Sequence, residues 1–233
     1  MRSNIPPIEL IHYATERLGD LCDRVTFLGG SVLGLLITDP AARPPRTTDD
    51  VDVAIDIASR LDYNQFEIEL RQRGFQNALE GPTCRFVAHP LILDVMPTDP
   101  NILGFSNPWY SAAISSADRM TLANGLTINL ISPACFIATK FAAFDSPDRE
   151  NSRDLISSRD FEDIVSLLDG RSTIESDVRG TEPELQNYLI SRFKDLLASP
   201  ILEFGISAHL DPDSASQGRI PEILQRIESI SRF

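Results

Sequence analysis

The clearest alternation of apolar and polar positions lies between residues 50 and 57. Four β-branched residues fall on one side of an extended chain, and four small or acidic residues fall on the other. The first set is Val51, Val53, Ile55 and Ile57, and the second is Asp50, Asp52, Ala54 and Asp56. This pattern predicts a strand with one apolar face.

Further short apolar runs, bounded by turn residues, predict strands over 25–28, 84–88, 91–96, 120–122 and 126–131. Turns at His89-Pro90 and Asn124-Gly125 join the last four into two hairpins. Helical spacing predicts helices over 8–24, 32–37 and 61–73, the last ending at Gly74. We expect Ser31 to cap the short middle helix, and we expect 41–48 to be a loop.

The character of the chain changes after Pro133, where helical spacing replaces alternation. Helices are predicted over 134–144, 159–168, 183–197 and 220–230, with polar loops at 145–153 and 211–218. The chain is therefore expected to be an α+β protein. A mixed sheet flanked by helices would span residues 1–131, and a helical C-terminal region would span 132–233.

Composition and charge narrow the class of protein. The chain has 233 residues, 42% of them hydrophobic, with a net charge of −13. Such acidity argues against a broad nucleic-acid groove. Two local arginine groups remain, and we expect most of these side chains to be solvated: Arg43 with Arg46, and Arg71 with Arg73 and Arg85.

Several features favour a cytoplasmic protein. No run of about 18 apolar residues predicts a membrane span, and the N-terminus lacks the apolar core of a signal peptide. Cys22, Cys84 and Cys135 are far apart and are expected to be reduced core thiols. The three histidines are scattered, so no histidine or cysteine metal site is predicted.

A glycine-rich turn is the first candidate for chemistry. Gly29, Gly30 and Ser31 stand between a predicted strand and a predicted helix. Glycine lets the backbone approach a ligand closely, and a helix start favours phosphate. A purely structural turn is the alternative interpretation of this short motif.

Carboxylates on two strands are the second candidate. Asp50 and Asp52 share one strand face, about 7 Å apart, and Asp94 interrupts the apolar strand 91–96. A buried carboxylate needs a partner. If the two strands are neighbours, the three carboxylates form a site for Mg²⁺ or Mn²⁺. A solvated strand face and a structural aspartate remain the alternatives.

This combination predicts phosphoryl chemistry. Two metals on three carboxylates promote an in-line displacement at phosphorus, with Asp94 as a candidate base. Gly30 and Ser31 would hold the triphosphate of an NTP such as ATP, and pyrophosphate would leave. The sequence has no G-x-x-x-x-G-K-[ST] motif, so a P-loop mechanism is excluded.

The order of these motifs resembles the nucleotidyltransferase (polymerase β-like) superfamily. The stretches 133–140 and 159–164 resemble the helical half of its AbiEii/MenT-type branch. The resemblance implies that Gly29, Gly30 and Ser31 bind phosphate. It also implies that Asp50, Asp52 and Asp94 bind metal.

The same resemblance implies roles for three residues of the helical half. Lys140 would contact the nucleotide phosphates, and Asp160, with Asp163, would lie near it. Without the resemblance, Lys140 would be read as a lysine that reaches solvent from an apolar helix. The acids would be read as ordinary first-turn residues.

The function indicated is metal-dependent transfer of a nucleoside monophosphate to RNA such as tRNA, protein or a small molecule. The resemblance also implies a toxin–antitoxin or phage-defence role with a cognate partner protein. The alternative is an inactive nucleotide-binding or protein-interaction module on the same fold. Trp109 and Tyr110 could stack on a base or anchor a loop, and we do not place them in the site.

Overall fold

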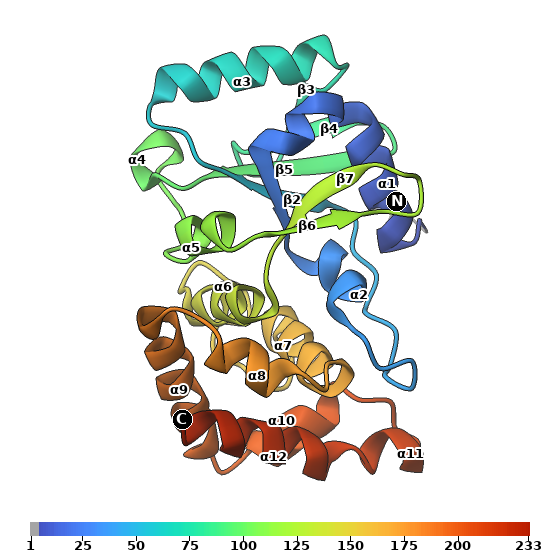
Figure 1. Cartoon of the computed structure of the whole chain (residues 1–233), viewed down its shortest axis with the longest axis vertical. Helices are drawn as coiled ribbons and strands as arrows, with labels where there is room; N and C mark the ends of the chain where they lie inside the picture. Colours follow the sequence, from blue (N-terminus) through green and yellow to red (C-terminus); the bar gives the residue numbers. More distant parts are fainter. Residues whose placement is uncertain (1–4) are drawn as a thin grey trace. The chain divides into compact units, whose positions relative to one another are not determined.

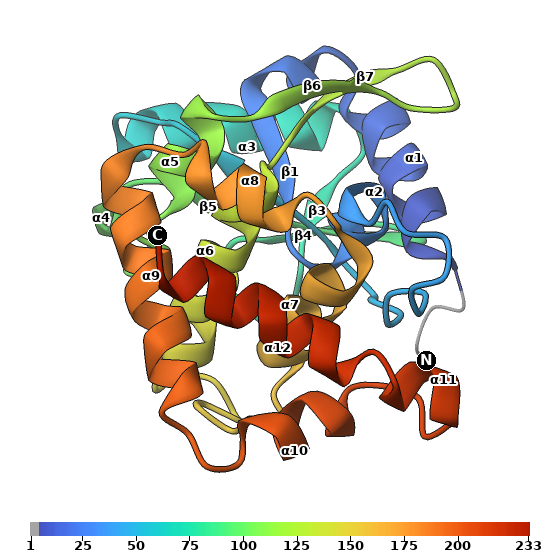
Figure 2. The same cartoon turned by 60° about the horizontal axis from the view of Figure 1, so that its bottom comes forward.

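The computed structural model describes residues 5–233 and divides into two compact units. The first comprises the described chain up to Gly34 together with Arg46–Ser132, and the second comprises Leu35–Pro45 and Pro133–Phe233 (Figures 1 and 2). Among the described residues, no helix combines the length and the apolar character that a membrane crossing requires.

The first unit carries all the strands of the described chain. Its elements are α1 (Pro7–Leu18), η1 (Gly19–Arg24), β1 (Val25–Leu28), η2 (Gly30–Val32), the start of α2 (Leu33–Leu36), β2 (Val51–Ile55), α3 (Arg60–Gln72), β3 (Gln76–Asn77), β4 (Arg85–Ala88), β5 (Leu91–Pro97), α4 (Pro100–Leu103), α5 (Tyr110–Ser115), β6 (Asp118–Thr121) and β7 (Thr127–Leu130).

The strands form one seven-stranded mixed sheet in the order β3-β4-β5-β2-β1-β7-β6 (Figure 1). β2 lies between β1, to which it is antiparallel, and β5, to which it is parallel. The hairpins β4–β5 and β6–β7 turn where the sequence predicts. The predicted mixed sheet flanked by helices is therefore confirmed.

Helix α3 makes the crossover that parallel β2 and β5 require. The Ser59 hydroxyl caps its start by accepting a hydrogen bond from the Asp62 N–H at 3.2 Å. Its buried face includes Tyr63 and Phe66, and the Tyr63 hydroxyl donates to the Val95 carbonyl at 2.9 Å. Gly74 ends it with φ +84°, as predicted.

Two local predictions in this unit are wrong. The helix predicted over 8–24 stops at Leu18 because Gly19 adopts φ +58°, and the chain continues as the 3-10 helix η1. Ser31 does not cap a helix, since it lies inside the 3-10 turn η2. The α-helix that follows, α2, has only four residues, so the expected helix dipole is small.

The second unit is helical. It contains the end of α2, α6 (Pro133–Asp145), α7 (Arg159–Gly170), α8 (Ile174–Arg179), α9 (Pro183–Leu197), α10 (Leu202–Ala208), α11 (Ser214–Gln217) and α12 (Ile220–Ser231). Helix α12 packs against α7, α8 and α9 (Figure 2). Helix α11 lies in the predicted loop 211–218, because Asp213 accepts hydrogen bonds from the N–H groups of Ala215 and Ser216.

Segment Leu35–Pro45 belongs to this helical unit although it is distant in sequence. The N–H groups of Thr38 and Asp39 donate to the Gly170 carbonyl at 2.8 and 2.9 Å. Arg219 donates to the Asp39 carboxylate at 2.6 Å. A Cβ on Gly170 would lie 2.7 Å from a methyl carbon of Ile37, so the glycine permits this close packing.

Candidate active site

The predicted carboxylates come together through the pairing of β2 with β5. Asp52 is the direct neighbour of Asp94 in the parallel register, and Asp50 immediately precedes β2. Adjacent strands lie about 4.8 Å apart. The structure therefore brings Asp50, Asp52 and Asp94 to one region of the first unit.

The glycine turn adjoins the same region. Leu28, the last residue of β1, pairs with Asp52, so the turn begins beside this carboxylate. Gly29 has φ +75°, and a Cβ there would lie 1.9 Å from Asp52 Oδ2. Glycine is thus required on two grounds, the left-handed conformation and the missing side chain.

Ser31 is buried in the turn after Gly30, with 2% of its surface exposed. Within the described residues, its hydroxyl oxygen has no hydrogen-bond partner. A buried polar group without a partner costs about 1–3 kcal/mol. A ligand with a hydrogen-bonding group at this position would satisfy the Ser31 hydroxyl.

Arg85 is a component of the cluster that the sequence analysis missed. Its Nε and Nη2 donate to the two oxygens of Asp94 at 2.8 and 2.7 Å, and Nη2 also donates to Asp50 Oδ2 at 2.9 Å. The interpretation of Arg85 as a solvated arginine is wrong, because only 26% of its side chain is exposed. The turn at His89-Pro90 sets Arg85 opposite Asp94 in the β4–β5 hairpin. Counting back from this turn along both strands would have predicted the pairing from the sequence.

The pKa values of Arg85 and Cys84 both respond to the negative charge of the neighbouring aspartates. The Asp94 side chain is 9% exposed and accepts both guanidinium bonds. These bonds with Asp94 raise the pKa of Arg85 above its usual value, so the guanidinium stays charged. Burial raises the pKa of the neighbouring Cys84 thiol to about 12, with Asp94 and Asp52 adding to the effect.

A divalent cation suits the chemistry of these groups. Between residues 5 and 233, no set of three or more His, Cys, Asp or Glu side chains is already arranged as a metal site. The guanidinium of Arg85 instead supplies the positive charge, held by Asp50 and Asp94. Oxygen donors that already hold a cation fit Mg²⁺ or Mn²⁺.

The second unit holds the other predicted site residues. Lys140 on α6 places its Nζ 2.7 Å from Asp163 and 3.3 Å from Asp160, both on α7. The Asp163 side chain is 1% exposed and that of Lys140 is 11% exposed. The alternative interpretation, in which Lys140 reaches solvent, is therefore wrong, since its ammonium group pairs with two aspartates inside the unit.

Tyr110 is a loop anchor rather than an exposed stacking surface. The side chain is 8% exposed, and its hydroxyl donates to the sulfur of Met96. This contact fixes the start of α5 against the end of β5.

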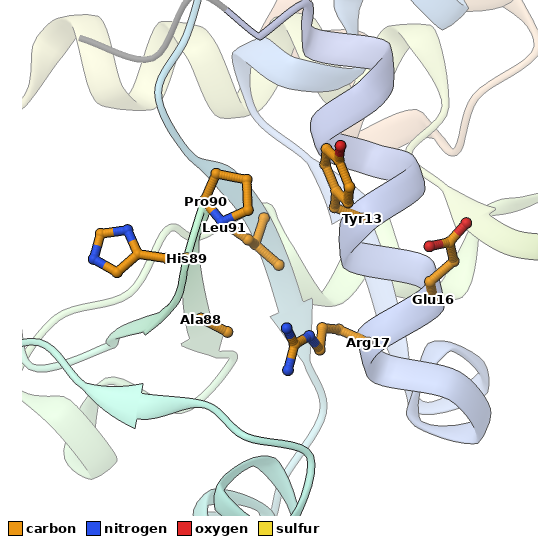
Figure 3. A pocket seen from close by; sticks show the side chains of 7 residues that line it. All are labelled: Tyr13, Glu16, Arg17, Ala88, His89, Pro90 and Leu91. Carbon is orange, nitrogen blue, oxygen red and sulfur yellow. The ribbon is translucent and has the colours of Figure 1, made fainter. Parts of the chain in front are cut away.

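A pocket of about 200 Å³ lies elsewhere in the first unit, between α1 and the β4–β5 turn (Figure 3). Its lining residues are Tyr13, Glu16, Arg17, Ala88, His89, Pro90 and Leu91. None of the predicted site residues lines it, so it does not add to the carboxylate cluster.

Comparison with known proteins shows a similarity of fold. The sequence matches no protein-family model and no curated protein. Among solved structures, the chain is similar to an antigenic nucleotidyltransferase-like protein from Paracoccidioides brasiliensis, with a TM-score of 0.50 and 20% sequence identity. The match covers 92% of this chain and 98% of that chain.

At this level of identity the similarity concerns the fold. The shared fold is consistent with the resemblance to the nucleotidyltransferase superfamily, and it does not test the AbiEii/MenT-type branch. The chain has a nucleotidyltransferase-like fold, with a mixed seven-stranded sheet followed by helices.

Proposed function

We propose that this chain is a metal-dependent nucleotidyltransferase. It would transfer a nucleoside monophosphate from an NTP to an acceptor and release pyrophosphate. The observation that supports this best is the register of Asp52 beside Asp94, directly next to the turn at Gly29. The nucleotidyltransferase-like fold is consistent with it.

Each residue of the cluster has a proposed role. Asp50, Asp52 and Asp94 would hold Mg²⁺ or Mn²⁺ through carboxylate oxygens. When bound, the cation would neutralise the triphosphate and activate the attacking hydroxyl. The Ser31 hydroxyl would donate to a phosphate oxygen, and the Gly29-Gly30 backbone would allow that approach. Asp94 would accept the proton of the attacking hydroxyl.

The finer assignments rest on the resemblance alone. They comprise a catalytic role for Lys140 and Asp160, and a toxin–antitoxin or phage-defence role with a cognate partner. The acceptor would be RNA, protein or a small molecule. RNA is the least favoured of these acceptors, because a chain with a net charge of −13 repels a polyanion such as RNA.

The first test is transfer of label from each α-³²P-NTP, with Mg²⁺ or Mn²⁺, to a mixture of cellular RNA, protein and small molecules. Wild type should label one fraction, and the Asp50→Asn/Asp52→Asn variant should not. Asp56→Asn is the matched control, because Asp56 follows the same strand but hydrogen-bonds to Thr98. If wild type consumed none of the four NTPs, the proposal would be wrong.

A second function is favoured by one observation. Arg85 forms ion pairs with two of the three carboxylates, those of Asp50 and Asp94, and offsets part of their negative charge. An inactive nucleotide-binding or protein-interaction module would keep these ion pairs permanently. Nucleotide binding without transfer, in both wild type and the double variant, would favour this module.

A further inference from the structure

Arg85 occupies the place in the cluster where positive charge is needed. Asp52 and Asp94 are direct strand neighbours, and Asp50 lies close enough to share the guanidinium with Asp94. Like charges at such separations repel strongly unless a cation neutralises them. Three charge-assisted hydrogen bonds from Arg85 to Asp50 and Asp94 supply one positive charge and reduce that repulsion.

The same bonds create a competition. A divalent cation that binds Asp50 and Asp94 must take over oxygens that Arg85 now occupies. The displaced guanidinium would remain charged, because an arginine side chain stays protonated in proteins even without an acidic partner. It would therefore need another anion, and planar guanidinium groups bind phosphate as well as carboxylate.

The surroundings of Arg85 allow it to change partners. Its side chain is 26% exposed. Gly81 lies against the stem and guanidinium of Arg85, since a Cβ on Gly81 would be 3.4 Å from Arg85 Cδ. Gly81 belongs to an exposed stretch with Glu80 and Pro82. The arginine therefore lies at an open edge of the cluster.

We propose that Arg85 is an exchangeable counter-cation, which holds Asp50 and Asp94 before substrate binds and transfers its hydrogen bonds to the triphosphate afterwards. This inference rests on the proposed function and deepens it. Arg85 would weaken metal binding in the absence of nucleotide and strengthen nucleotide binding in the presence of metal. The arrangement would couple the two ligands by a factor of about 5 to 150, the usual range for such coupling.

The test measures two binding constants without any turnover. Mn²⁺ binding to the protein alone is followed by electron paramagnetic resonance. Binding of α,β-methylene-ATP at saturating Mn²⁺ is followed by calorimetry. In Arg85→Gln, Mn²⁺ should bind at least about fivefold more tightly, and the nucleotide analogue should bind at least about fivefold more weakly.

Two further variants make the result specific. Arg71→Gln removes an arginine from the same unit that pairs with Glu67 on α3 outside the cluster, and it should change neither constant. Arg85→Lys keeps the charge but loses the paired geometry, so it should weaken analogue binding. It also provides a folded comparison if Arg85→Gln is unstable.

The outcomes separate this inference from the proposed function. Opposite shifts of the two constants in Arg85→Gln support the exchange. If wild type binds both ligands and Arg85→Gln leaves analogue binding unchanged, Arg85 is a structural counter-ion and the inference is overturned alone. If wild type binds neither Mn²⁺ nor any nucleotide analogue with Mn²⁺, the inference and the proposed function both fail.

Discussion

Asp52 and Asp94 are direct neighbours in the parallel pairing of β2 with β5, which brings residues 42 positions apart into one acidic cluster. Asp94 is the more buried of the acids that Arg85 pairs with, and its side chain is only 9% exposed. In the proposed reaction it is both a metal ligand and the proton acceptor. Of the three carboxylates, its removal should therefore lower the transfer rate most.

Replacing Asp94 with asparagine should lower the transfer rate at least about 100-fold, because amide nitrogen and oxygen neither accept the proton nor hold the cation well. The rate is measured with labelled NTP at saturating concentration. Unchanged transfer would remove Asp94 from the chemistry and leave it as the partner of Arg85 only.

Gly29→Ala should abolish nucleotide binding and lower stability, since the added Cβ would lie 1.9 Å from Asp52 Oδ2. Gly125→Ala is a matched control for backbone strain. Gly125 has φ +82°, close to the +75° of Gly29, but nothing lies within 4 Å of an added Cβ. We expect the control to lose about 1–2 kcal/mol of unfolding free energy and to bind normally. Equal behaviour of the two variants would count against a close approach at Gly29.

Ser31→Ala separates binding from stability. The Ser31 hydroxyl has no partner in the described structure, so its removal should leave the melting temperature unchanged or raised. Nucleotide affinity should fall about tenfold, the effect of losing a hydrogen bond to a charged phosphate. Calorimetry and thermal denaturation provide both values. A destabilised variant with normal affinity would mean that Ser31 has a structural partner instead.

Lys140→Met should destabilise the helical unit by about 3–5 kcal/mol, because it removes the ammonium group that lies 2.7 Å from the buried Asp163 carboxylate. Adding Asp163→Asn should restore part of this loss, since the uncompensated charge is then removed. Lys194→Met on α9 changes an exposed lysine and should stay within about 0.5 kcal/mol of wild type. Chemical denaturation measures all three. A single-variant loss no larger than that of the control would contradict a buried ion pair.

His209 should make the helical unit less stable below neutral pH. Burial lowers the pKa of His209 in the folded state, and its ring nitrogen lies 2.9 Å from the Leu155 carbonyl. In the unfolded chain the histidine has an unperturbed pKa of about 6.5. As the pH falls, the unfolded chain therefore binds more protons than the folded chain. Stability should therefore decline below about pH 6.5.

The decline is measured by denaturant titrations between about pH 7.5 and 5. His209→Gln should flatten it, whereas the exposed His89→Gln should not. An identical pH dependence in wild type and His209→Gln would show that other groups cause it.

Local sequence signals predicted much of the framework correctly. Alternation over 50–57 predicted β2, and the turn residues His89-Pro90 and Asn124-Gly125 predicted two hairpins. Such signals succeed because the period of a strand and the conformational demands of a turn involve only residues close in sequence. The break at Gly19 escaped prediction, since apolar spacing continues past it while the backbone turns left-handed.

The sequence by itself determined which residue types were available to the candidate site: two aspartates on one strand, a third on another, and a glycine turn nearby. Only the tertiary structure decided which strand lies beside β2, because a parallel pair is joined by a distant crossover and not by a local turn. It also decided that Arg85 pairs with Asp50 and Asp94, that Lys140 is buried against Asp163, and that Leu35–Pro45 belongs with the helices. These outcomes depend on burial and on long-range pairing, which appear only when segments far apart in sequence pack together.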